Sequence, residues 1–361
     1  MWILRGAASC HAGNTVTDPC AIFIRLAGAA LLVICVEGCS IVSSPIEASI
    51  ERRLMRSKMS EGEFGARVGD KGDRIQFTMF TGYVHPAPVV VPMSKRFRGL
   101  PGVDVRLNDR HTIRMLADTG AQLSIVDAAS VLAAGGRTYV PEKWNFSVTG
   151  IGGSEQAWLA RFDRASIGSV TLRSFTTVVR RHKTEVQLGG MSVGAIPINL
   201  LGCPVLLGFR YVTFNYADGS FVFSPGTSFT PPRGASRVPL TVKDQLLYVP
   251  LRIGGRTMSA MVDTGAKDQI FLNTQTVRAF KLQDRVSTGG TYRALGLGGE
   301  TTGRQFTVPL AFMGNVPLQN VVIDTSDSES WDARIGSDLL ERWKVTFDFQ
   351  TGSMWLESPT L

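Results

Sequence analysis

Short apolar runs separated by glycine and polar turn residues recur along most of the chain. Residues 103–107 alternate apolar and polar side chains, as expected of a strand with one buried face. Residues 115–117 and 260–262 are instead continuously apolar, and each run is followed by the tetrapeptide Asp-Thr-Gly-Ala. A glycine two residues after a buried strand lets the backbone turn sharply. With 38 glycines and frequent short runs of Val, Ile, Phe and Thr, the pattern predicts an all-β protein.

The landmarks of this pattern occur twice, in the same order and at a nearly fixed offset. The two tetrapeptides begin at Asp118 and Asp263, which lie 145 positions apart. Four further pairs accompany them: Val91-Pro92 with Val238-Pro239, residues 150–153 with 296–299, Gly168 with Gly314, and Thr213-Phe214 with Thr346-Phe347. Such ordered self-similarity indicates an internal duplication of one unit. A buried, unpaired carboxylate is costly, so two matched Asp residues at strand ends suggest that their side chains face each other.

The duplication divides the chain into segments. A length of 361 residues with 44% hydrophobic residues is enough for two domains of ordinary size. The boundary falls in a stretch rich in Pro, Gly, Ser and Thr between residues 224 and 234. We therefore predict a first lobe over 88–226 and a second over 227–361, preceded by an extension over 40–87. Apolar residues of 46–55 recur near helical spacing, which predicts a short amphipathic helix that docks on the first lobe or serves as a spacer.

At this point the motifs resemble a known family. Asp-Thr-Gly-Ala, a glycine-rich hairpin, and then apolar residues before a glycine (Leu206-Leu207-Gly208 in the first lobe, Arg334-Ile335-Gly336 in the second) are similar to the aspartic peptidases. The tetrapeptide and the Ile-Gly-Gly hairpin resemble retropepsins, whereas two lobes in one chain resemble pepsin. The resemblance covers roughly residues 88 to 358. It implies an all-β, bilobal pepsin-like fold of two duplicated β-barrel-like lobes with an active-site cleft between them.

The resemblance also implies roles for individual residues. Asp118 and Asp263 would be the catalytic pair, and the glycines and threonines beside them would hold the carboxylates and bond across the lobes. Ser124 occupies a position near the pair where the family often has a hydroxyl, whereas the second lobe has Gln269. Two flaps would close on the substrate. The predicted supporting and flap residues are Thr119, Gly120, Thr264, Gly265 and Ser124, and Gly150, Ile151, Gly152, Gly153, Gly296, Leu297, Gly298 and Gly299.

The function implied is that of an aspartic endopeptidase acting on a polypeptide. Two adjacent carboxylates that share one proton would activate a water and polarise the scissile carbonyl, with an optimum at acidic to neutral pH. Two alternatives stay open: a non-catalytic lipoprotein that binds peptides in the same cleft, and a protease with a single regulatory target. The resemblance requires no metal or other cofactor. An internal pseudo-dimer would act as a monomer.

The N-terminal 39 residues predict export. Residues 26–36 form an apolar stretch after Arg25 that is suited to a secretory signal and too short to span a bilayer, which takes about 20 residues. Val36-Glu37-Gly38-Cys39 resembles the bacterial lipobox, which implies lipidation of Cys39 and a periplasmic or membrane-anchored lipoprotein. An uncleaved N-terminal anchor, or a signal cut elsewhere, would explain the same stretch.

Charge and cysteine content bear on three other kinds of site: nucleic-acid interfaces, disulfides and zinc clusters. The net charge of +8 favours weak attraction to anionic surfaces. No basic stripe is interleaved with aromatic residues, so we expect no nucleic-acid interface. Four of the five cysteines fall in the predicted leader and leave Cys203 alone in the body, where neither a disulfide nor a zinc cluster can form. We expect Cys203 to pack as a small buried hydrophobe.

The two lobes are expected to differ outside these motifs. The first lobe has a longer segment between Val178 and Gly208 than the second has before Gly336, and we interpret it as an inserted surface loop. The second lobe is expected to close with a short helix after Gly336. In the first lobe the next strand follows Gly208 so soon that this helix is expected to be shortened or lost.

Overall fold

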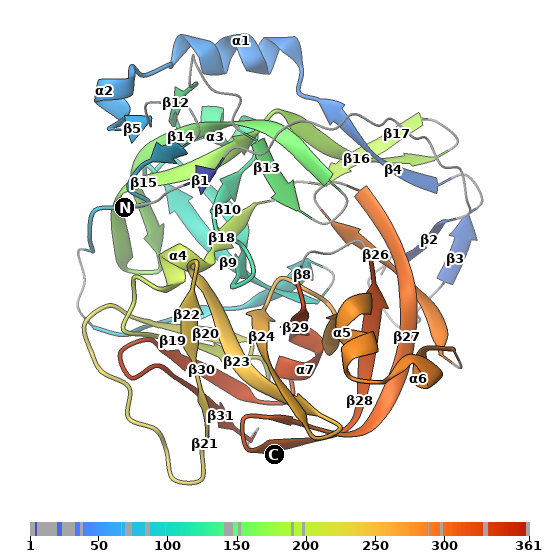
Figure 1. Cartoon of the computed structure of the whole chain (residues 1–361). Coiled ribbons are helices and arrows are strands. Elements are labelled where there is room, and N and C mark those ends of the chain that lie inside the picture. The colour runs from blue at the N-terminus through green and yellow to red at the C-terminus, as the bar shows by residue number, and fades with distance from the viewer. Residues whose placement is uncertain are drawn as a thin grey trace.

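The computed structural model describes most of the chain. It covers residues 4–5, 20–23, 33–36, 39–65, 67–68, 74–83, 87–97, 99–140, 147–150, 153–188, 191–196, 199–287, 289–296, 299–327 and 331–358. The described part is mostly β-strand, arranged as two barrel-like lobes that Figure 1 shows one above the other. The predicted all-β, bilobal fold is confirmed.

The first lobe is built on one sheet that closes on itself. Its strands are paired in the order β12-β14-β15-β11-β18-β10-β9-β8, with β13 beside β14, and β14 also pairs with β9. That last pairing joins the two ends of the sheet into a barrel. The strands are β8 (Ser94–Phe97), β9 (Leu100–Leu107), β10 (His111–Asp118), β11 (Ile125–Val126), β12 (Arg137–Tyr139), β13 (Ser147–Gly150), β14 (Gly153–Ile167), β15 (Val170–Arg180) and β18 (Leu200–Gly202).

The second lobe repeats this plan. Its sheet has the order β22-β23-β24-β29-β25-β28-β27-β26 and is closed by pairing of β23 with β27. The closing pair Leu107↔Ala165 of the first lobe corresponds to Ile253↔Ala311, with the same offset of 146 at both residues. The strands are β22 (Thr241–Lys243), β23 (Leu246–Ile253), β24 (Arg256–Asp263), β25 (Ile270–Asn273), β26 (Gly290–Gly296), β27 (Gly299–Met313), β28 (Val316–Ser326) and β29 (Ala333–Gly336).

A third sheet joins the lobes. Each lobe contributes three strands to the order β21-β31-β30-β19-β20-β7. The strands are β7 (Val89–Pro92), β19 (Tyr211–Asn215), β20 (Ser220–Ser224), β21 (Ser236–Pro239), β30 (Lys344–Asp348) and β31 (Ser353–Glu357). At its centre, β19 and β30 are antiparallel with Thr213 opposite Thr346, and their buried hydroxyls lie 2.8 Å apart. Phe214 and Phe347 pack edge to face beside them, at 5.6 Å between ring centroids. The repeated sequence therefore meets itself across an approximate two-fold axis.

The turns before the two tetrapeptides match each other. Asn108 and Asp109 connect β9 to β10, and Gly254 and Gly255 connect β23 to β24. All four residues have positive φ. The left-handed region suits glycine and is tolerated by Asn and Asp, which explains why these residue types occur at both turns.

Seven helices are described, and most of them are short. They are α1 (Ala48–Arg56), α2 (Glu61–Phe64), α3 (Ala128–Ala133), α4 (Cys203–Leu206), α5 (Thr274–Ala279), α6 (Gln283–Ser287) and α7 (Ser337–Leu340). Asp127 caps α3 by accepting from Ser130 N, and Asn273 caps α5 by accepting from Thr276 N. Such caps satisfy backbone donors that a helix leaves unpaired at its start.

The segment between Val178 and Gly208 is more regular than expected. It folds as the end of β15, then β16 (His182–Leu188), β17 (Met191–Ile196) and β18. β16 pairs on one side with β17 and on the other with β4 (Cys39–Pro45). Interpreting this segment as a surface loop was therefore wrong, because its backbone groups are paired in a small three-stranded sheet.

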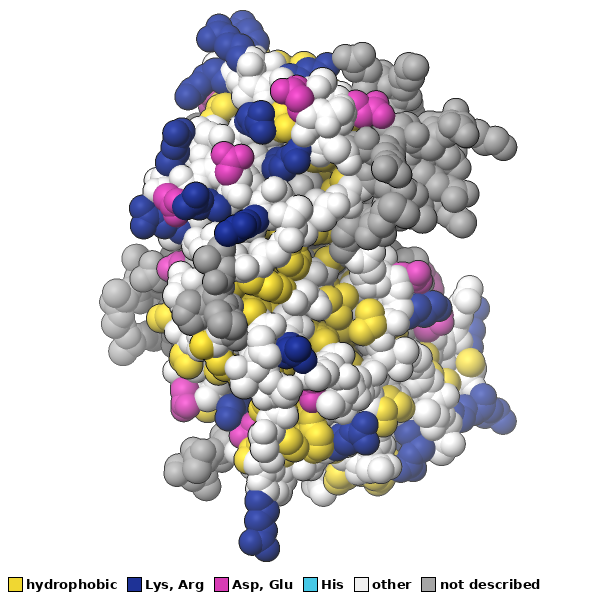
Figure 2. All heavy atoms as spheres, turned by 90° about the vertical axis from the view of Figure 1, so that its left-hand side faces the viewer, with side chains coloured by type: hydrophobic (Ala, Val, Ile, Leu, Met, Phe, Trp, Pro, Cys, Tyr) yellow, Lys and Arg dark blue, Asp and Glu magenta, His cyan; other side chains and the backbone are white. Residues whose placement is uncertain are grey.

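The extension before the first lobe includes the predicted helix α1. Leu54 is fully buried, its carbonyl accepts from Thr138 Oγ1 at 2.7 Å, and Ile46 and Ile50 pack against the core. Met55, which also fitted the helical spacing, is 39% exposed. Lys and Arg side chains gather at the end of the molecule where α1 and α2 lie (Figure 2), in keeping with the exposed Arg52, Arg53 and Arg56. The helix docks on the first lobe through one face.

The remaining N-terminal strands lie in small sheets. They are β1 (Leu4–Arg5), β2 (Cys20–Phe23), β3 (Val33–Val36), β5 (Arg67–Val68) and β6 (Arg74–Gln76). β2 pairs with β3, and β6 lies between β1 and β5. Cys39 is the first residue of β4, opposite Leu188. Within the described residues, no helix is long and apolar enough to cross a membrane. Export and lipidation of Cys39 stay sequence-based predictions.

Truncating the buried anchor of α1 should weaken the protein. Leu54→Ala is expected to lower the free energy of unfolding by about 2–5 kcal/mol, because it leaves a cavity between α1 and the barrel. Met55→Ala on the same helix is the control and should change that free energy by less than about 1 kcal/mol. Urea unfolding of both variants measures the difference. Equal effects would contradict docking of α1 through Leu54.

Candidate active site

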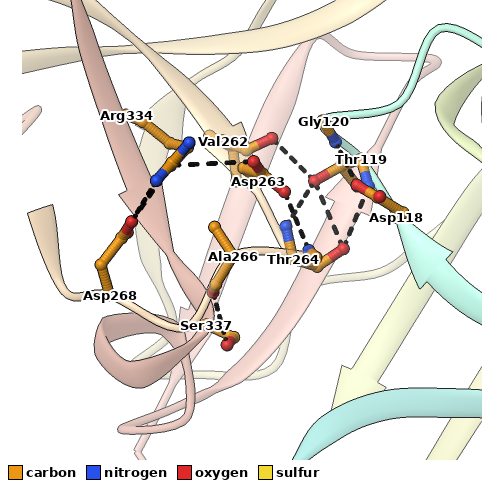
Figure 3. A network of polar contacts seen from close by, with 11 residues as sticks. Asp118, Thr119, Gly120, Val262, Asp263, Thr264, Ala266, Asp268, Arg334 and Ser337 are labelled. Carbon is orange, nitrogen blue, oxygen red and sulfur yellow. Dashed lines mark hydrogen bonds and ion pairs between the residues drawn. The ribbon is translucent and has the colours of Figure 1, made fainter. Parts of the chain in front are cut away.

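Both tetrapeptides lie where the closed sheets of the two lobes approach each other. Asp118 ends β10 and Asp263 ends β24. Each Asp is paired in parallel with a glycine, Asp118 with Gly202 of β18 and Asp263 with Gly336 of β29. The buried strands thus deliver two acidic side chains, far apart in sequence, to one junction (Figure 3).

The strand pairing corrects the motif assigned to the first lobe. Gly202, preceded by Leu200-Leu201, is the counterpart of Gly336, whereas Gly208 lies beyond the helix α4. A Cβ at Gly202 would lie 2.6 Å from the Leu123 carbonyl, so the turn after Asp118 requires a glycine there. α4 and α7, with four residues each, start directly after the two glycines. The expectation that this helix is shortened or lost in the first lobe was therefore wrong.

The glycines of the tetrapeptides bring the two carboxyl groups together. Gly120 N donates to Asp118 Oδ1 at 2.8 Å, and Gly265 N donates to Asp263 Oδ1 at 2.9 Å. A Cβ on Gly120 would lie 2.3 Å from Cγ of Asp263, and a Cβ on Gly265 would lie 2.5 Å from Cγ of Asp118. Each carboxyl group therefore lies against the glycine of the opposite loop. Any side chain at either glycine would displace the acid of the other lobe.

The threonines fix the two loops to each other. Thr119 Oγ1 accepts from Thr264 N at 3.0 Å and donates to Val262 O at 2.7 Å. Thr264 Oγ1 accepts from Thr119 N at 3.1 Å and donates to Ala117 O at 2.6 Å. Both threonines are fully buried. These reciprocal bonds are the cross-lobe contacts that the family resemblance implied, and they satisfy polar groups that would otherwise be buried without partners.

The environment of Asp118 disfavours its charged form. Burial, the charge of Asp263 and a hydrogen bond to Asp263 raise the pKa of Asp118 well above its usual value, which outweighs the lowering effect of Gly120 N. Asp118 is 9% exposed, and the Asp263 side chain is 13% exposed. A carboxyl group whose pKa is raised in this way keeps its proton to a higher pH than an exposed Asp does.

Ser124 supports the strand beside Asp118. Its buried hydroxyl accepts from Gly202 N at 3.1 Å. In the second lobe, Gln269 accepts from Val322 N and Arg342 Nη2, and its carbonyl accepts from Gly336 N. Both residues brace the parallel strand next to the acid, but through different atoms. Ser124 therefore acts on the backbone that positions Asp118.

Both predicted flaps are hairpins with two-residue tips. Gly150 of β13 pairs with Gly153 of β14, and Gly296 of β26 pairs with Gly299 of β27. The tips themselves, Ile151-Gly152 and Leu297-Gly298, lie outside the described residues. In Figure 1 both hairpins lie at the level where the two lobes face each other. Two glycines thus frame each tip, where backbone can approach a bound ligand closely.

An ion pair that the sequence did not predict lies beside Asp263. Arg334 of β29 donates to Asp268 Oδ2 through Nε at 3.1 Å and also through Nη2. Its Nε lies 3.7 Å from Asp263 Oδ2 (Figure 3). Arg334 and Asp268 are only 4% and 7% exposed. The signal was present, because Arg334 stands where the motif before the glycine otherwise has an apolar residue.

Further acidic residues lie near the ion pair of Arg334 and Asp268. Asp324 of β28 accepts from Gln305 Nε2 at 2.8 Å, and burial raises its pKa to about 6. Asp338 of α7 pairs with Lys267 at 2.6 Å. Cys203 is buried, as expected, and burial together with the nearby acids raises the pKa of its thiol. Among the described residues no group of His, Cys, Asp and Glu has the arrangement of a metal site.

The chain matches one family model. The model, described as aspartyl protease, matches residues 103–205 and 249–339, which together are more than half of the chain. The first segment contains Asp118 and Gly202, and the second contains Asp263 and Gly336. No curated protein matches the sequence.

Two solved structures resemble parts of the chain. An aspartic proteinase from Irpex lacteus has 14% sequence identity and a TM-score of 0.45, over 76% of this chain and 98% of that chain. A retropepsin-like aspartic protease from Rickettsia conorii has 21% identity and a TM-score of 0.29, over 36% of this chain and 95% of that chain.

Removing one cross-lobe hydroxyl should destabilise the fold. Thr119→Val keeps the shape of the side chain but leaves Thr264 N and Val262 O without their partner, at a cost of about 2–4 kcal/mol. Thr257→Val on the exposed face of β24 is the matched control and should cost less than about 0.5 kcal/mol. Chemical denaturation gives both values. A Thr119→Val variant as stable as the control would contradict the role given to these bonds.

The raised pKa of Asp324 should appear in the pH dependence of stability. A carboxyl group whose pKa is higher in the folded than in the unfolded protein favours folding below about pH 4, and this contribution is lost as the pH rises through about 6. Asp324→Asn removes that loss and can still accept from Gln305. Relative to wild type, the variant should therefore become more stable as the pH rises from 4 to 7. Thermal melts across this range measure the difference, and a constant difference would refute the assignment.

Proposed function

The chain belongs to the aspartyl protease family, and we propose that it is an endopeptidase that hydrolyses peptide bonds with a water held between Asp118 and Asp263. The observation that carries this proposal is that each carboxyl group lies against the glycine of the opposite loop, where Asp263 is close enough to raise the pKa of Asp118. The support around them is symmetric in its backbone and threonine bonds.

The chemistry requires one carboxylate and one carboxylic acid. The ionised acid accepts a proton from water as the water oxygen attacks the scissile carbonyl carbon. The protonated acid donates to the carbonyl oxygen, so that a neutral tetrahedral intermediate forms. On collapse, the C–N bond breaks and the amine nitrogen takes the proton that the base received. The acid recovers its proton from a hydroxyl of the intermediate, and the pair is ready for another cycle.

The proposed substrate is an extended polypeptide that lies across the junction of the lobes. The two flap hairpins, β13–β14 and β26–β27, would hold its backbone from either lobe by adding strand-like hydrogen bonds. A site of this kind recognises main chain along several residues. It therefore favours cleavage within unfolded or flexible segments of a protein over cleavage of folded domains.

Neutralising either acid should abolish cleavage. Asp118→Asn and Asp263→Asn are expected to lower kcat/KM for an unfolded protein substrate by about 10³-fold or more, because each leaves the pair without its acid or its base. Both variants should fold, since they replace a buried carboxyl group by a neutral isostere. Asp163→Asn, at an exposed position of β14, is the control and should retain activity.

The pH profile provides a second readout of the same experiment. Activity should fall at low pH as the base becomes protonated. It should also fall as the pH rises through the raised pKa of Asp118, when the pair loses its shared proton. Equal cleavage by wild type and both variants would exclude the pair. A wild type that binds but never cleaves an unfolded protein would favour a peptide-binding role instead.

A further inference from the structure

The two lobes differ in charge next to the acids. In the second lobe, Arg334 is buried next to Asp263, with its guanidinium held by Asp268 and stacked over the Phe271 ring at 5.1 Å. Burial of an Arg–Asp pair carries a desolvation cost that apolar residues would avoid. Its position at one acid of the pair suggests that it has a role besides stability.

The first lobe has no equivalent cation among its described residues. Strand pairing places Leu200 at the position of Arg334, since Leu116 pairs with Leu200 as Met261 pairs with Arg334. Leu123, five residues after Asp118, takes the place of Asp268. The same scaffold therefore carries leucines at these two positions in the first lobe and an ion pair in the second.

We propose that Arg334, held by Asp268, is a positioning residue that keeps Asp263 ionised and thereby assigns the shared proton to Asp118. This inference rests on the proposed function. An opposite charge within about 4–6 Å favours the charged form of a carboxyl group. Nε of Arg334 lies 3.7 Å from Asp263 Oδ2, while Asp263 Oδ1 accepts from Gly265 N. Both oxygens of Asp263 thus face positive partners.

The other charged groups nearby do not reverse the preference for an ionised Asp263. If Asp268 is ionised, the pair is neutral in sum but still turns its positive end towards Asp263. If Asp268 is protonated, Arg334 is a full cation beside Asp263. Asp338 is paired with Lys267, and Asp324 accepts from Gln305 with a pKa raised by burial. Across the junction, the pKa of Asp118 is raised by burial and by Asp263, and the Cys203 thiol is held neutral.

The assignment gives each acid one role. Asp263 accepts the proton of the attacking water and passes it to the departing amine. Asp118 donates its proton to the carbonyl oxygen and recovers it when the tetrahedral intermediate collapses. The difference between charged base and neutral acid then comes from residues outside the two loops, because the loops themselves make matching backbone and threonine bonds.

The test compares three variants by the pH profile of kcat/KM on an unfolded protein. The acidic limb of this profile is the fall of kcat/KM at low pH. Arg334→Met should shift it to higher pH by about 1 unit or more, because Asp263 loses its cation. Arg334→Lys keeps a positive charge and should return the limb towards wild type. Asp268→Asn keeps the charge of Arg334, so the limb should stay in place or move to lower pH, and a move to higher pH would contradict the proposal. If the ion pair is merely structural, these substitutions should lower activity at every pH without shifting the pH at which activity falls on either side of the profile.

The proposal can still be tested if a variant does not fold or if the wild type is inactive. Should Arg334→Met fail to fold, as judged by circular dichroism, the carboxyl titration of the wild type described below decides. Should wild type cleave nothing, the proposed function fails separately. A ¹³C carboxyl NMR titration, assigned with Asp118→Asn and Asp263→Asn, then measures the bias directly. The proposal requires Asp263 to titrate below Asp118 in wild type, and a reversed order overturns it.

Discussion

Two buried carboxyl groups in contact cannot both be charged, and the architecture of this protein follows from holding them there. The cost of bringing acids together is met by fixed donors: one backbone N–H from each Asp-x-Gly turn, and threonine hydroxyls that bond across the lobes. Because each carboxyl group lies against the opposite glycine, neither loop can move without moving the acid of the other. The proton that the pair must share is the source of the proposed chemistry.

The duplication provides the symmetry that such a pair requires. Two closed sheets with matching registers deliver the acids, and a six-stranded sheet with Thr213 opposite Thr346 joins the lobes. A symmetric pair, however, has no preference for which acid keeps the proton. Divergence between the lobes supplies one, since Arg334 and Asp268 stand where the first lobe has Leu200 and Leu123. Symmetry brings the acids together, and asymmetry assigns their roles.

Much of this arrangement could be predicted from the sequence, for a physical reason. Period-two alternation, glycine turns and the repeated offset are local or periodic signals, so they predicted the strands, both lobes and the two acids. Which glycine pairs with Asp118 could not be predicted, because two apolar residues before a glycine occur at both Gly202 and Gly208. Only the parallel pairing of β10 with β18 distinguishes them. The sheet formed by β4, β16 and β17 depends on contacts distant in sequence, which no local pattern encodes. Arg334 was visible in the sequence as a charged residue in a motif that is otherwise apolar. Its role, however, can be inferred only from its distance to Asp263.

The central claim is that Asp118 and Asp263 share a single proton at the junction of the lobes. Neutron diffraction from a perdeuterated crystal grown at mildly acidic pH would locate that proton directly. The account predicts one deuterium on the facing carboxyl oxygens, bonded to Asp118, with Asp263 bare of deuterium. Two deuteriums, none, or one bonded to Asp263 would contradict it.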